Sequence, residues 1–452
     1  MVRCGNAVTP WAEAREAARE LGDRLWPATG RPVALDRAVG AVLARDLTAL
    51  VGVPPFDAAA MDGYAVAGPG PRWRVVGRVL AGGRAAEKTE GVGRAERAEA
   101  GGEGELPGGG AGGLSAADSG SHPVPGLPTS DPVPGPMPDP VLRPGEAVEI
   151  ATGAPVPAGT DAVLPYEHAT AARGEVAGEI ALGRHVRRAG EDTAPGATVL
   201  PAGSAVTPAV VGLAASLGHD TLTVRRPRIA ALVTGDEIAA TGRPGAGQVR
   251  DAIGPMLPAL AASAGAELTG LRHIGDGFDT MVEALASAAG PVDVVVVCGA
   301  SSKGPADHLR AALARIGATV VVDGVSCRPG HPQLLAHLGT PEDPGTVVVG
   351  LPGNPNAALA AAVTLLAPLL RAMAGAPDPD AALPPTIRVK GAIRPHAHDT
   401  RLVAVRVMGG QAEPVGHDRP GSLRGPALAD AYAVIPPGWS GPYAPLVWLP
   451  RG

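Results

Sequence analysis

Four hydrophobic runs in the second half of the chain each end in a loop rich in Gly, Pro, Asp or Ser. They are IAALVTGDE (229–237), VDVVVVCGASSKGPAD (292–307), ATVVVDGVSCRPGHP (318–332) and TVVVGLPGNP (346–355). Short Val-rich runs separated by helical patterns are typical of buried parallel strands. Because such sheets bind ligands in the crevice at the carboxyl ends of their strands, we expect the chemistry of this chain in that crevice.

Other segments carry apolar residues at the three- and four-residue spacing of a helix. The first begins after Thr9 and Pro10, which we predict as its N-cap and first-turn residues. Its apolar positions are Trp11, Ala14, Ala18, Leu21 and Leu25. Further helices are predicted at Leu35 to Leu47, Thr207 to Leu217, Asp307 to Ile316 and Asn356 to Leu370.

The longest apolar segment, Ala357 to Leu370, contains Pro368 and is shorter than the roughly 20 residues that cross a bilayer. We therefore predict a buried helix packed on the sheet and no membrane span. The N-terminus lacks the basic start, apolar stretch and cleavage site of a secretory signal.

A β-rich region with a long insert lies in the first half of the chain. Trp73 to Leu80 alternates like a strand, and Glu146 to Ile150 resumes strand character. Between Gly101 and Pro140, 20 of 40 residues are Gly or Pro, and no aromatic residue occurs from 83 to 140. So few buriable side chains cannot offset the entropy of ordering, so we predict a disordered insert there.

After Pro377 the pattern returns to short strands, such as Thr386 to Lys390, Arg401 to Val407 and Ala431 to Ile435. A small β-barrel or sandwich fits this pattern. At 452 residues the chain exceeds the size of a single core, so several domains are expected.

The net charge of -6 provides no global basic field, so we expect no nucleic-acid partner. Positive charge that could hold an anionic ligand is local, as at Arg188, Lys303 and Arg328. The three cysteines, Cys4, Cys298 and Cys327, show no CxxC spacing, which argues against a zinc site or disulfides and suits a cytoplasmic location. Cys298 is predicted as a small core residue.

Two strand-end loops have the composition of anion sites. In GLPGNPNAA (350–358), Asn354 or Asn356 can cap the following helix while backbone amides face an anion. A plain strand-to-helix turn without a ligand is the alternative. The loop CGASSKGPAD (298–307) supplies two hydroxyls and one ammonium before a helix, which suits a phosphate or other oxyanion, although it is not a Walker motif.

Acidic residues gather on neighbouring loops of the predicted sheet. They are Asp236, Glu237, Asp251, Asp276 and Asp307. Carboxylates beside a phosphate site commonly hold Mg²⁺, whereas any one of them alone can equally be a helix cap. Two further loops, VPPFDAAAMDGYAV (53–66) and EIATGAPVPAGTDAVLPYE (149–167), add Asp62 and Thr152.

Taken in order, these motifs resemble the molybdopterin molybdenumtransferases, the MoeA or gephyrin E-domain family. The matching elements are PPFDAAAMDGYAV, ATGAPVPAGTDAV, RRAGEDTAPG (187–196), VTGDE, the loop that ends at Asp307, RPGHP and LPGNP. The match spans nearly all of the chain except the Gly/Pro insert.

The resemblance implies a multidomain protein of α/β plus β class. It predicts a helical dimerisation domain (1–52 and 197–226) and a β-rich domain (53–196) with the disordered insert at about 83–140. A three-layer α/β molybdopterin-binding domain (227–376) and a C-terminal β-barrel domain (377–452) follow. It also implies a homodimer, with the active cleft between subunits.

The activity implied by the resemblance is insertion of molybdate into adenylylated molybdopterin with release of AMP, assisted by Mg²⁺. Catalytic roles then fall on Asp62, Asp192, Glu237 and Asp307. Substrate-binding roles fall on Thr152, Arg188, Asp236, Asp251, Ser302, Lys303, Arg328, Pro352, Gly353 and Asn354. Glu237 and Asp276 are the expected metal ligands, and molybdopterin adenylyltransferase and molybdoenzymes are the expected protein partners.

The chain departs from the family pattern at three loops. It has GASSKG (299–304) in place of GGVSVG, Asp251-Ala252-Ile253 in place of an Asp-Ser-Asn triplet, and Arg328 and His331 in the loop that usually carries Lys and PGKP. His331 is a poor cation at neutral pH, so we hypothesise that Lys303 supplies the missing charge.

Two other functions stay open at this point. A catalytically weak paralogue that carries molybdopterin or molybdenum cofactor is favoured by the altered loops. An adenylyltransferase acting one step earlier would share the α/β domain, but the first 226 residues and the C-terminal β segment argue against it.

Overall fold

The computed structural model describes residues 8–25, 30–80, 141–299, 307–340, 345–376 and 386–450. The chain divides into two compact units: a larger one of Met1–Leu50 and Gly196–Gly452, and a smaller one of Val51–Pro195. The predicted division into four domains is finer than this and stays a prediction.

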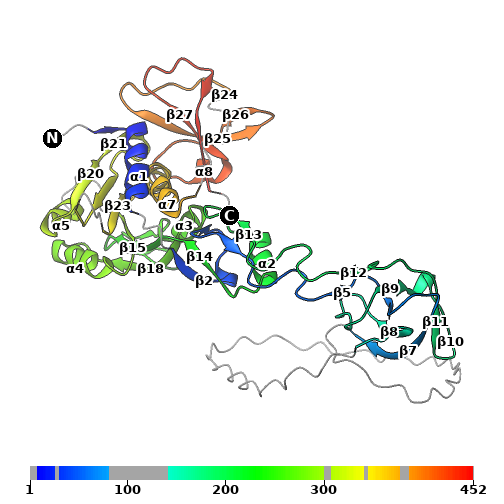
Figure 1. Ribbon diagram of the computed structural model, residues 1–452. Coiled ribbons are helices and arrows are strands. Elements are labelled where there is room, and N and C mark those ends of the chain that lie inside the picture. The colour runs from blue at the N-terminus through cyan, green and yellow to red at the C-terminus, as the bar shows by residue number, and fades with distance from the viewer. Residues whose placement is uncertain are drawn as a thin grey trace, which may run out of the picture. The chain divides into compact units, whose positions relative to one another are not determined.

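The larger unit is built on a six-stranded sheet of order β18-β15-β19-β23-β22-β20 (Figure 1). The strands are β15 (Arg228–Thr234), β18 (Glu267–Ile274), β19 (Val294–Cys298), β20 (Thr319–Asp323), β22 (Leu334–His337) and β23 (Val347–Leu351). Neighbours from β18 to β23 run parallel, whereas β22 runs antiparallel to both β23 and β20. The carboxyl ends of β15, β19 and β23 therefore meet at one edge of the sheet.

Both faces of this sheet are covered, which is why its central strands are apolar at every position. Val294, Val296 and Cys298 join a core with α1 (Trp11–Leu25), α3 (Leu257–Ser263) and the helix that follows β23. Val295 and Val297 face the opposite core, against α4 (Phe278–Ala288) and α5 (Leu309–Arg315). Three layers result, as the α/β pattern predicts.

The prediction of four buried strands is wrong for the third run. β20 lies at the sheet edge, and three of its five residues are exposed. The chain then enters β21 (Val325–Arg328), which pairs with β1 (Thr9–Pro10) and β25 (Thr400–Met408) in a second sheet. Thr9 and Pro10 are thus strand residues and not a helix cap, and the helix begins at Trp11.

One long buried helix follows β23, as predicted. It consists of α6 (Pro355–Ala361), a π-helical turn η4 (Ala362–Leu366) and α7 (Ala367–Ala374). It has the length and apolarity of a membrane span, yet 89% of its most apolar window is buried within the protein. At the π-helical turn, Arg15 Nη1 donates to Val363 O at 2.7 Å and Trp11 Nε1 donates to Thr364 Oγ1 at 3.0 Å, which fixes α1 on this helix.

The predicted helix at Leu35 to Leu47 is wrong. Only one 3-10 turn forms there, η1 (Leu35–Arg37), followed by β3 (Val42–Leu43) and β4 (Leu47–Thr48). Gly40 has a φ of +85°, which no residue of a right-handed helix adopts. β3 and β2 (Arg31–Ala34) pair with β14 (Thr221–Arg225), so pairing with a distant strand overrides the local helical pattern.

Other elements of this part of the larger unit follow the sequence pattern more closely. The predicted helix at Thr207 to Leu217 is present as α2 (Pro208–Ser216), and Thr207 Oγ1 accepts from Val210 N as its N-cap. β13 (Thr198–Leu200) pairs with β4, and β16 (Ile238–Ala239) pairs with β17 (Val249–Arg250). The short turn η3 (Gly254–Met256) leads into α3.

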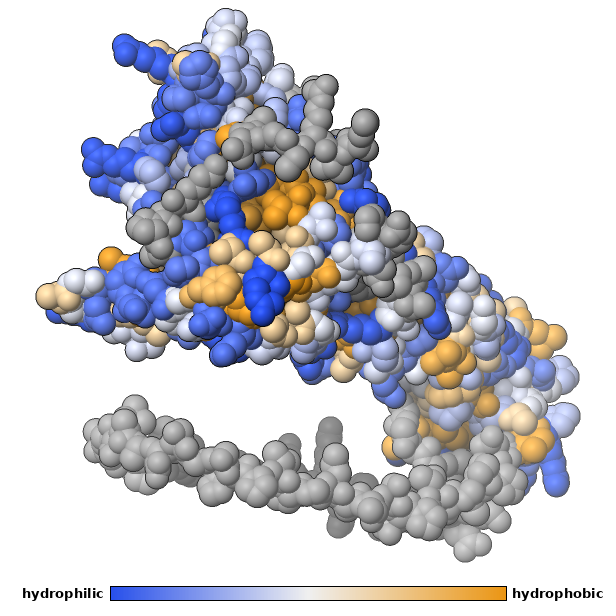
Figure 2. All heavy atoms as spheres, turned by 90° about the vertical axis from the view of Figure 1, so that its left-hand side faces the viewer, coloured by the Kyte–Doolittle hydropathy of each residue, from blue (hydrophilic) through white to orange (hydrophobic). Residues whose placement is uncertain are grey.

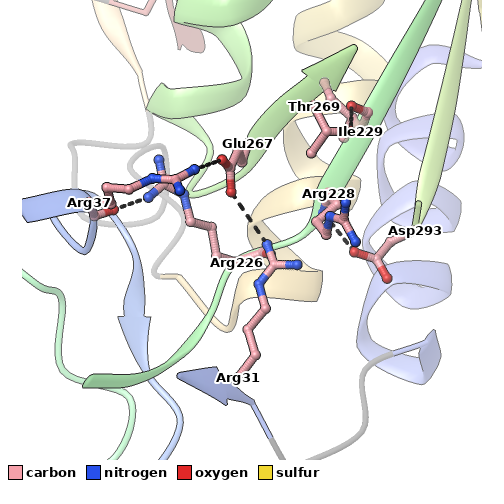
Figure 3. A network of polar contacts seen from close by, with 8 residues as sticks. All are labelled: Arg31, Arg37, Arg226, Arg228, Ile229, Glu267, Thr269 and Asp293. Atoms are coloured by element: carbon pink, nitrogen blue, oxygen red, sulfur yellow. Dashed lines mark hydrogen bonds and ion pairs between the residues drawn. The ribbon is translucent and has the colours of Figure 1, made fainter. Parts of the chain in front are cut away.

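An arginine-rich junction closes the amino edge of the central sheet, opposite the predicted site (Figure 3). Glu267 at the start of β18 accepts from Arg37 at 2.7 Å and lies 3.7 Å from Arg31. Arg226 donates to the carbonyl of Arg37, and the Asp293 carboxylate accepts from Arg228 N at 2.6 Å. These contacts join the 30–50 segment to the start of the sheet.

The smaller unit contains a six-stranded sheet of order β10-β11-β7-β8-β6-β9. Its strands are β6 (Gly63–Val66), β7 (Arg72–Val79), β8 (Glu146–Ile150), β9 (Ala162–Pro165), β10 (Thr170–Ala172) and β11 (Glu175–Ala177). The predicted strands on either side of the insert are therefore confirmed, and β7 and β8 are parallel neighbours. η2 (Tyr166–His168), β5 (Ala58–Ala59) and β12 (Val186–Arg187) complete the unit, while the predicted disorder at 83–140 lies outside the described residues.

A second sheet of the larger unit carries the C-terminal residues. β25 pairs with β26 (Gln411–Pro414) and β27 (Ala431–Ile435), and the sheet also includes β24 (Ile387–Val389), β28 (Tyr443–Ala444) and β29 (Leu446–Trp448). The three strands predicted in this region are present, and α8 (Arg424–Leu428) lies between β26 and β27. Closure of these strands into a barrel stays a prediction.

The surface of the chain mixes hydrophilic and hydrophobic residues. On the face shown in Figure 2, orange areas are interspersed with blue ones. Among the described residues, the exposed large hydrophobic residues Val249, Val320 and Met408 belong to three different strands. Single exposed apolar residues of this kind are normal for a globular protein.

Gly22 and Gly212 form a matched pair for testing the contact between α1 and α7. A Cβ at Gly22 would lie 2.5 Å from Leu369 O and 2.7 Å from Ala372 Cβ, whereas a Cβ at Gly212 in α2 would meet nothing within 4 Å. We expect Gly22→Ala to lower the free energy of unfolding by about 1 to 3 kcal/mol. Gly212→Ala should raise it by roughly 0.5 to 1 kcal/mol through helix propensity.

Urea denaturation of both variants checks this expectation. A Gly22→Ala variant as stable as Gly212→Ala would show that the two helices are not in such close contact.

Candidate active site

Three strand-end turns are in contact at the carboxyl edge of the central sheet. Gly299 after β19 has a φ of +105°, and a Cβ there would lie 2.8 Å from Thr234 Oγ1 and 2.9 Å from Thr234 O. Gly299 N donates to Leu351 O at 3.1 Å, and a Cβ on Gly353 would lie 3.5 Å from Gly299 Cα. Only glycine allows this approach of the turns after β15, β19 and β23.

The LPGNP turn runs directly into α6. Asn354 occupies the N-cap position but its side chain makes no capping hydrogen bond. Asn356 is buried in the first turn of the helix and does not cap it either, so the predicted capping role is wrong for both residues. The amides of Asn356 and Ala357 donate to Pro420 O at 2.9 and 3.2 Å. These two amides are therefore engaged within the protein. An anion at this turn would have to bind the amides of the preceding residues.

Asp236 and Asp276 bring two acidic loops together. Asp236 Oδ1 accepts from Asp276 N at 3.2 Å, and a Cβ on Gly275 would lie 2.9 Å from the same oxygen. Glu237 folds back over the turn, since its Oε2 would lie 2.6 Å from a Cβ on Gly235. These carboxylates thus follow the carboxyl end of β15 and the end of β18, as the strand order requires.

Asp251 is a buried anchor with three partners. Its Oδ1 accepts from Ile253 N and Gly254 N, both at 2.9 Å, and its Oδ2 lies 2.9 Å from His273 Nε2. The two amide contacts hold the turn that starts η3 and α3, and the third joins Asp251 to His273 on β18. His273 was missed by the sequence analysis, because β18 was not predicted and a single histidine on a strand gives no signal.

Asp307 is the carboxylate whose pKa burial raises. Its side chain is only 3% exposed, Oδ1 accepts from Leu309 N at 3.2 Å, and Oδ2 is buried without a hydrogen-bond partner among the described residues. Arg310 Nη1 lies 3.7 Å from Oδ2, beyond hydrogen-bond distance. Burial raises the pKa of Asp307 to about 6. The group can therefore exchange a proton near neutral pH.

The RPGHP loop is held from the C-terminal sheet. Arg328 Nε donates to Asp399 Oδ2 at 2.7 Å, and His396 Nδ1 lies 3.3 Å from the same oxygen. Gln333 Nε2 donates to Gly330 O at 2.8 Å and so fixes the turn. Arg328, which was expected to bind a ligand, is thus paired with Asp399.

Two of the predicted binding residues, Ser302 and Lys303, lie outside the described residues.

Cys298 and Cys327 are buried, and burial raises the pKa of both thiols, that of Cys327 to about 12. The prediction of Cys298 as a core residue is confirmed. Among the described residues, no three or more His, Cys, Asp or Glu side chains gather into a metal-binding group.

The predicted site residues of the smaller unit form hydrogen-bonded pairs. Asp62 Oδ1 accepts from Thr152 N at 2.7 Å and from Thr152 Oγ1 at 3.0 Å. These two bonds, the backbone one first, lower the pKa of Asp62, so this exposed carboxylate stays ionised. Arg187 is paired with Asp192.

Arg188 is paired with Asp57, a carboxylate for which the sequence motifs predicted no role. Asp57 Oδ1 accepts from Ala189 N at 2.8 Å and its Oδ2 accepts from Arg188 Nη1 at 2.6 Å. The amide bond and then the guanidinium lower the pKa of Asp57. β5 pairs with β12, and Ala59 exchanges backbone hydrogen bonds with Gly153 and Ala154, so the three motifs of this unit lie side by side.

Comparison with known proteins covers most of the chain. A family model described as the MoeA N-terminal region (domain I and II) matches residues 9–218, and one described as a probable molybdopterin binding domain matches 230–372. Molybdopterin molybdenumtransferase 2 of Mycobacterium tuberculosis is 33% identical over 357 residues, which cover 77% of this chain and 76% of the relative. The molybdopterin molybdenumtransferase of Bacillus subtilis is 30% identical over 312 residues, covering 66% and 71%.

A solved structure of a molybdopterin biosynthesis MoeA protein from Pyrococcus horikosii has the same fold. It covers 99% of this chain and 100% of its own, with a TM-score of 0.65 and 24% identity.

Asp307 should make stability depend on pH in a direction opposite to that of most carboxylates. Its folded pKa of about 6 lies above the ordinary value of 3.8, so the folded state holds the proton up to a higher pH than the unfolded state. The stability contribution of Asp307 therefore falls as pH rises from about 4 to about 6. Asp307→Asn keeps the Oδ1 acceptor for Leu309 N and removes the titration.

We expect the stability of Asp307→Asn relative to the wild type to increase across this pH range. Urea unfolding at pH 4, 5, 6 and 7 measures the difference. A difference that is constant with pH would contradict the raised pKa.

Proposed function

The chain belongs to the family of molybdopterin molybdenumtransferases, and we propose that it inserts molybdate into adenylylated molybdopterin, releasing AMP and molybdenum cofactor. The observation that carries the proposal is the contact of the turns at Thr234, Gly299 and Gly353, with Asp236, Asp276 and Asp307 on adjoining loops. This edge offers backbone and carboxylate groups to a phosphorylated ligand.

We assign roles to the larger unit from the geometry of the described groups, and to Ser302 and Lys303 from the composition of their loop. The LPGNP turn binds the phosphate or pterin with the amides of Gly353 and Asn354, while Pro352 shapes the turn. Ser302 and Lys303 would add a hydroxyl and an ammonium. Asp307, with a pKa of about 6, is suited to take a proton from a water or return it to a leaving oxygen near neutral pH. Asp251 acts on the site indirectly, because its Oδ1 holds the η3 turn through two amides and its Oδ2 contacts His273 on β18.

The carboxylates fit a Mg²⁺ ion whose remaining ligands come from the substrate. No cage of three protein ligands exists among the described residues, but Mg²⁺ is commonly held by one or two carboxylates together with substrate phosphates. Glu237 and Asp276 are the groups that would hold it. When bound, the ion would offset the charge of the pyrophosphate.

We assign Asp62, Thr152, Arg188 and Asp192 of the smaller unit to the same reaction. The ionised Asp62 is suited to water or metal contacts, and Arg188 to an anion, with its charge moderated by Asp57. We further propose that the chain acts as a homodimer in the cytoplasm. A molybdopterin adenylyltransferase must supply its substrate, and molybdoenzymes would take its product.

The direct test is to mix the purified protein with adenylylated molybdopterin, Mg²⁺ and molybdate and to measure AMP release. We expect molybdate-dependent AMP, reduced about 100-fold or more in Asp307→Asn because a proton-transfer group is lost. Asp279→Asn, which alters an exposed carboxylate on α4, is the matched control and should retain activity.

The result also separates the two candidate functions. No AMP above a protein-free control, together with molybdopterin binding, would reject the transferase and favour the carrier that the altered GASSKG and RPGHP loops suggest.

Lys303 provides a second test, aimed at the departure from the family pattern. If it supplies the charge that His331 lacks at neutral pH, Lys303→Ala should raise KM for adenylylated molybdopterin by roughly tenfold, which corresponds to about 1.4 kcal/mol. Lys390→Ala, in the C-terminal sheet region, is the control. Unaltered KM and kcat in Lys303→Ala would refute the hypothesis.

A further inference from the structure

The side-chain amide of Asn356, at the beginning of α6, contacts the C-terminal sheet and the segment that precedes β27. Tyr432 Oη on β27 donates to Asn356 Oδ1 at 2.7 Å, and Asn356 Nδ2 donates to Arg419 O at 3.1 Å. Pro420 O, next in the chain, accepts the amides of Asn356 and Ala357. A Cβ on Gly421 would lie 3.6 Å from Asn354 Oδ1, so this segment also lies against the LPGNP turn itself.

This contact is buried. Tyr432 and Asn356 are each 1% exposed. Burial raises the pKa of Tyr432, so its hydroxyl stays protonated and remains a donor. Removing the donor would leave Asn356 Oδ1 buried without a partner, which costs more than an exposed hydrogen bond contributes.

The second loop expected to bind substrate is held from the same sheet. β21 pairs with β25, with Arg328 opposite Arg401, and the side chain of Arg328 is oriented by Asp399. Tyr432, Leu402 and Ala404 also belong to the core that contains α6 and α7. Both RPGHP and LPGNP are therefore anchored by residues that lie 60 or more positions further along the chain.

We propose that Tyr432 and Asn356 are positioning residues that lock the LPGNP turn in its ligand-binding geometry, so that pterin affinity is coupled to docking of the C-terminal sheet. The inference rests on the proposed function of that turn. Because coupling between sites is reciprocal, molybdopterin binding should in turn tighten the contact between β27 and α6.

The test uses the full chain and molybdopterin itself, with binding measured anaerobically by calorimetry. Tyr432→Phe removes the hydroxyl and keeps the ring. We expect it to weaken molybdopterin binding about fivefold or more and to raise KM with little change in kcat, because ground-state and transition-state binding are lost together. The matched control is Tyr443→Phe in the same sheet, at an exposed tyrosine.

A double variant distinguishes positioning from simple stability. Tyr432→Phe with Asn356→Leu replaces both polar partners by apolar groups of similar shape, so Tm should return toward the wild-type value. The double variant does not restore the polar anchor and also loses the bond from Asn356 Nδ2 to Arg419 O, so the weakened binding should persist.

Binding by Tyr432→Phe within twofold of the wild type, or recovery of binding together with Tm in the double variant, would overturn the proposal. If the wild type itself binds no molybdopterin, the proposed function fails and hydrogen exchange of residues 350–358 decides the positioning role. Faster exchange there in Tyr432→Phe than in Tyr443→Phe supports it, and equal exchange rejects it.

Discussion

The close approach of Gly299 to Thr234 is the constraint on which the candidate site depends. It brings the ends of β15 and β19 within contact distance, and Gly353 then packs on the same glycine from β23. A side chain at 299 would separate the turns and move the loops that carry Asp236 and Asp307. The positive φ and the missing Cβ act together, because both the backbone conformation and the spacing require glycine.

Two kinds of anchor convert this contact into a site. Local anchors are short-range, such as Asp251 holding the η3 turn through the amides of Ile253 and Gly254. Distant anchors come from the C-terminal sheet, where Asp399 orients Arg328 and Tyr432 holds Asn356. A ligand site assembled from loops needs both, since loops alone lack the packed neighbours that fix a geometry.

The sequence predicted the parts of this architecture that depend on local pattern. β15, β19 and β23 are continuous apolar runs because both faces are buried, and the helix after LPGNP was equally clear. The helix prediction for Leu35 to Leu47 was wrong because Val42 and Leu43 pair with β14. This contact spans some 180 residues, and no local periodicity reveals it. β18 and β22 were not predicted either, so His273 on β18, the partner of Asp251, was also missed. Motif order located the candidate loops, but the partners of Arg188, Arg328 and Asn356 arise only from tertiary contacts.

The packing of α1 has a consequence for how the chain folds during its synthesis. Arg15 donates to Val363, 348 positions later, and Trp11 contacts Thr364. The first helix therefore leaves the ribosome long before the surface that buries Ala14, Ala18 and Leu21 exists. Residues 51–195 form a contiguous unit that can fold in the interval, whereas completion of the larger unit must await nearly the whole polypeptide. An N-terminal segment with an apolar face and no partner is, for that time, a natural substrate for chaperones.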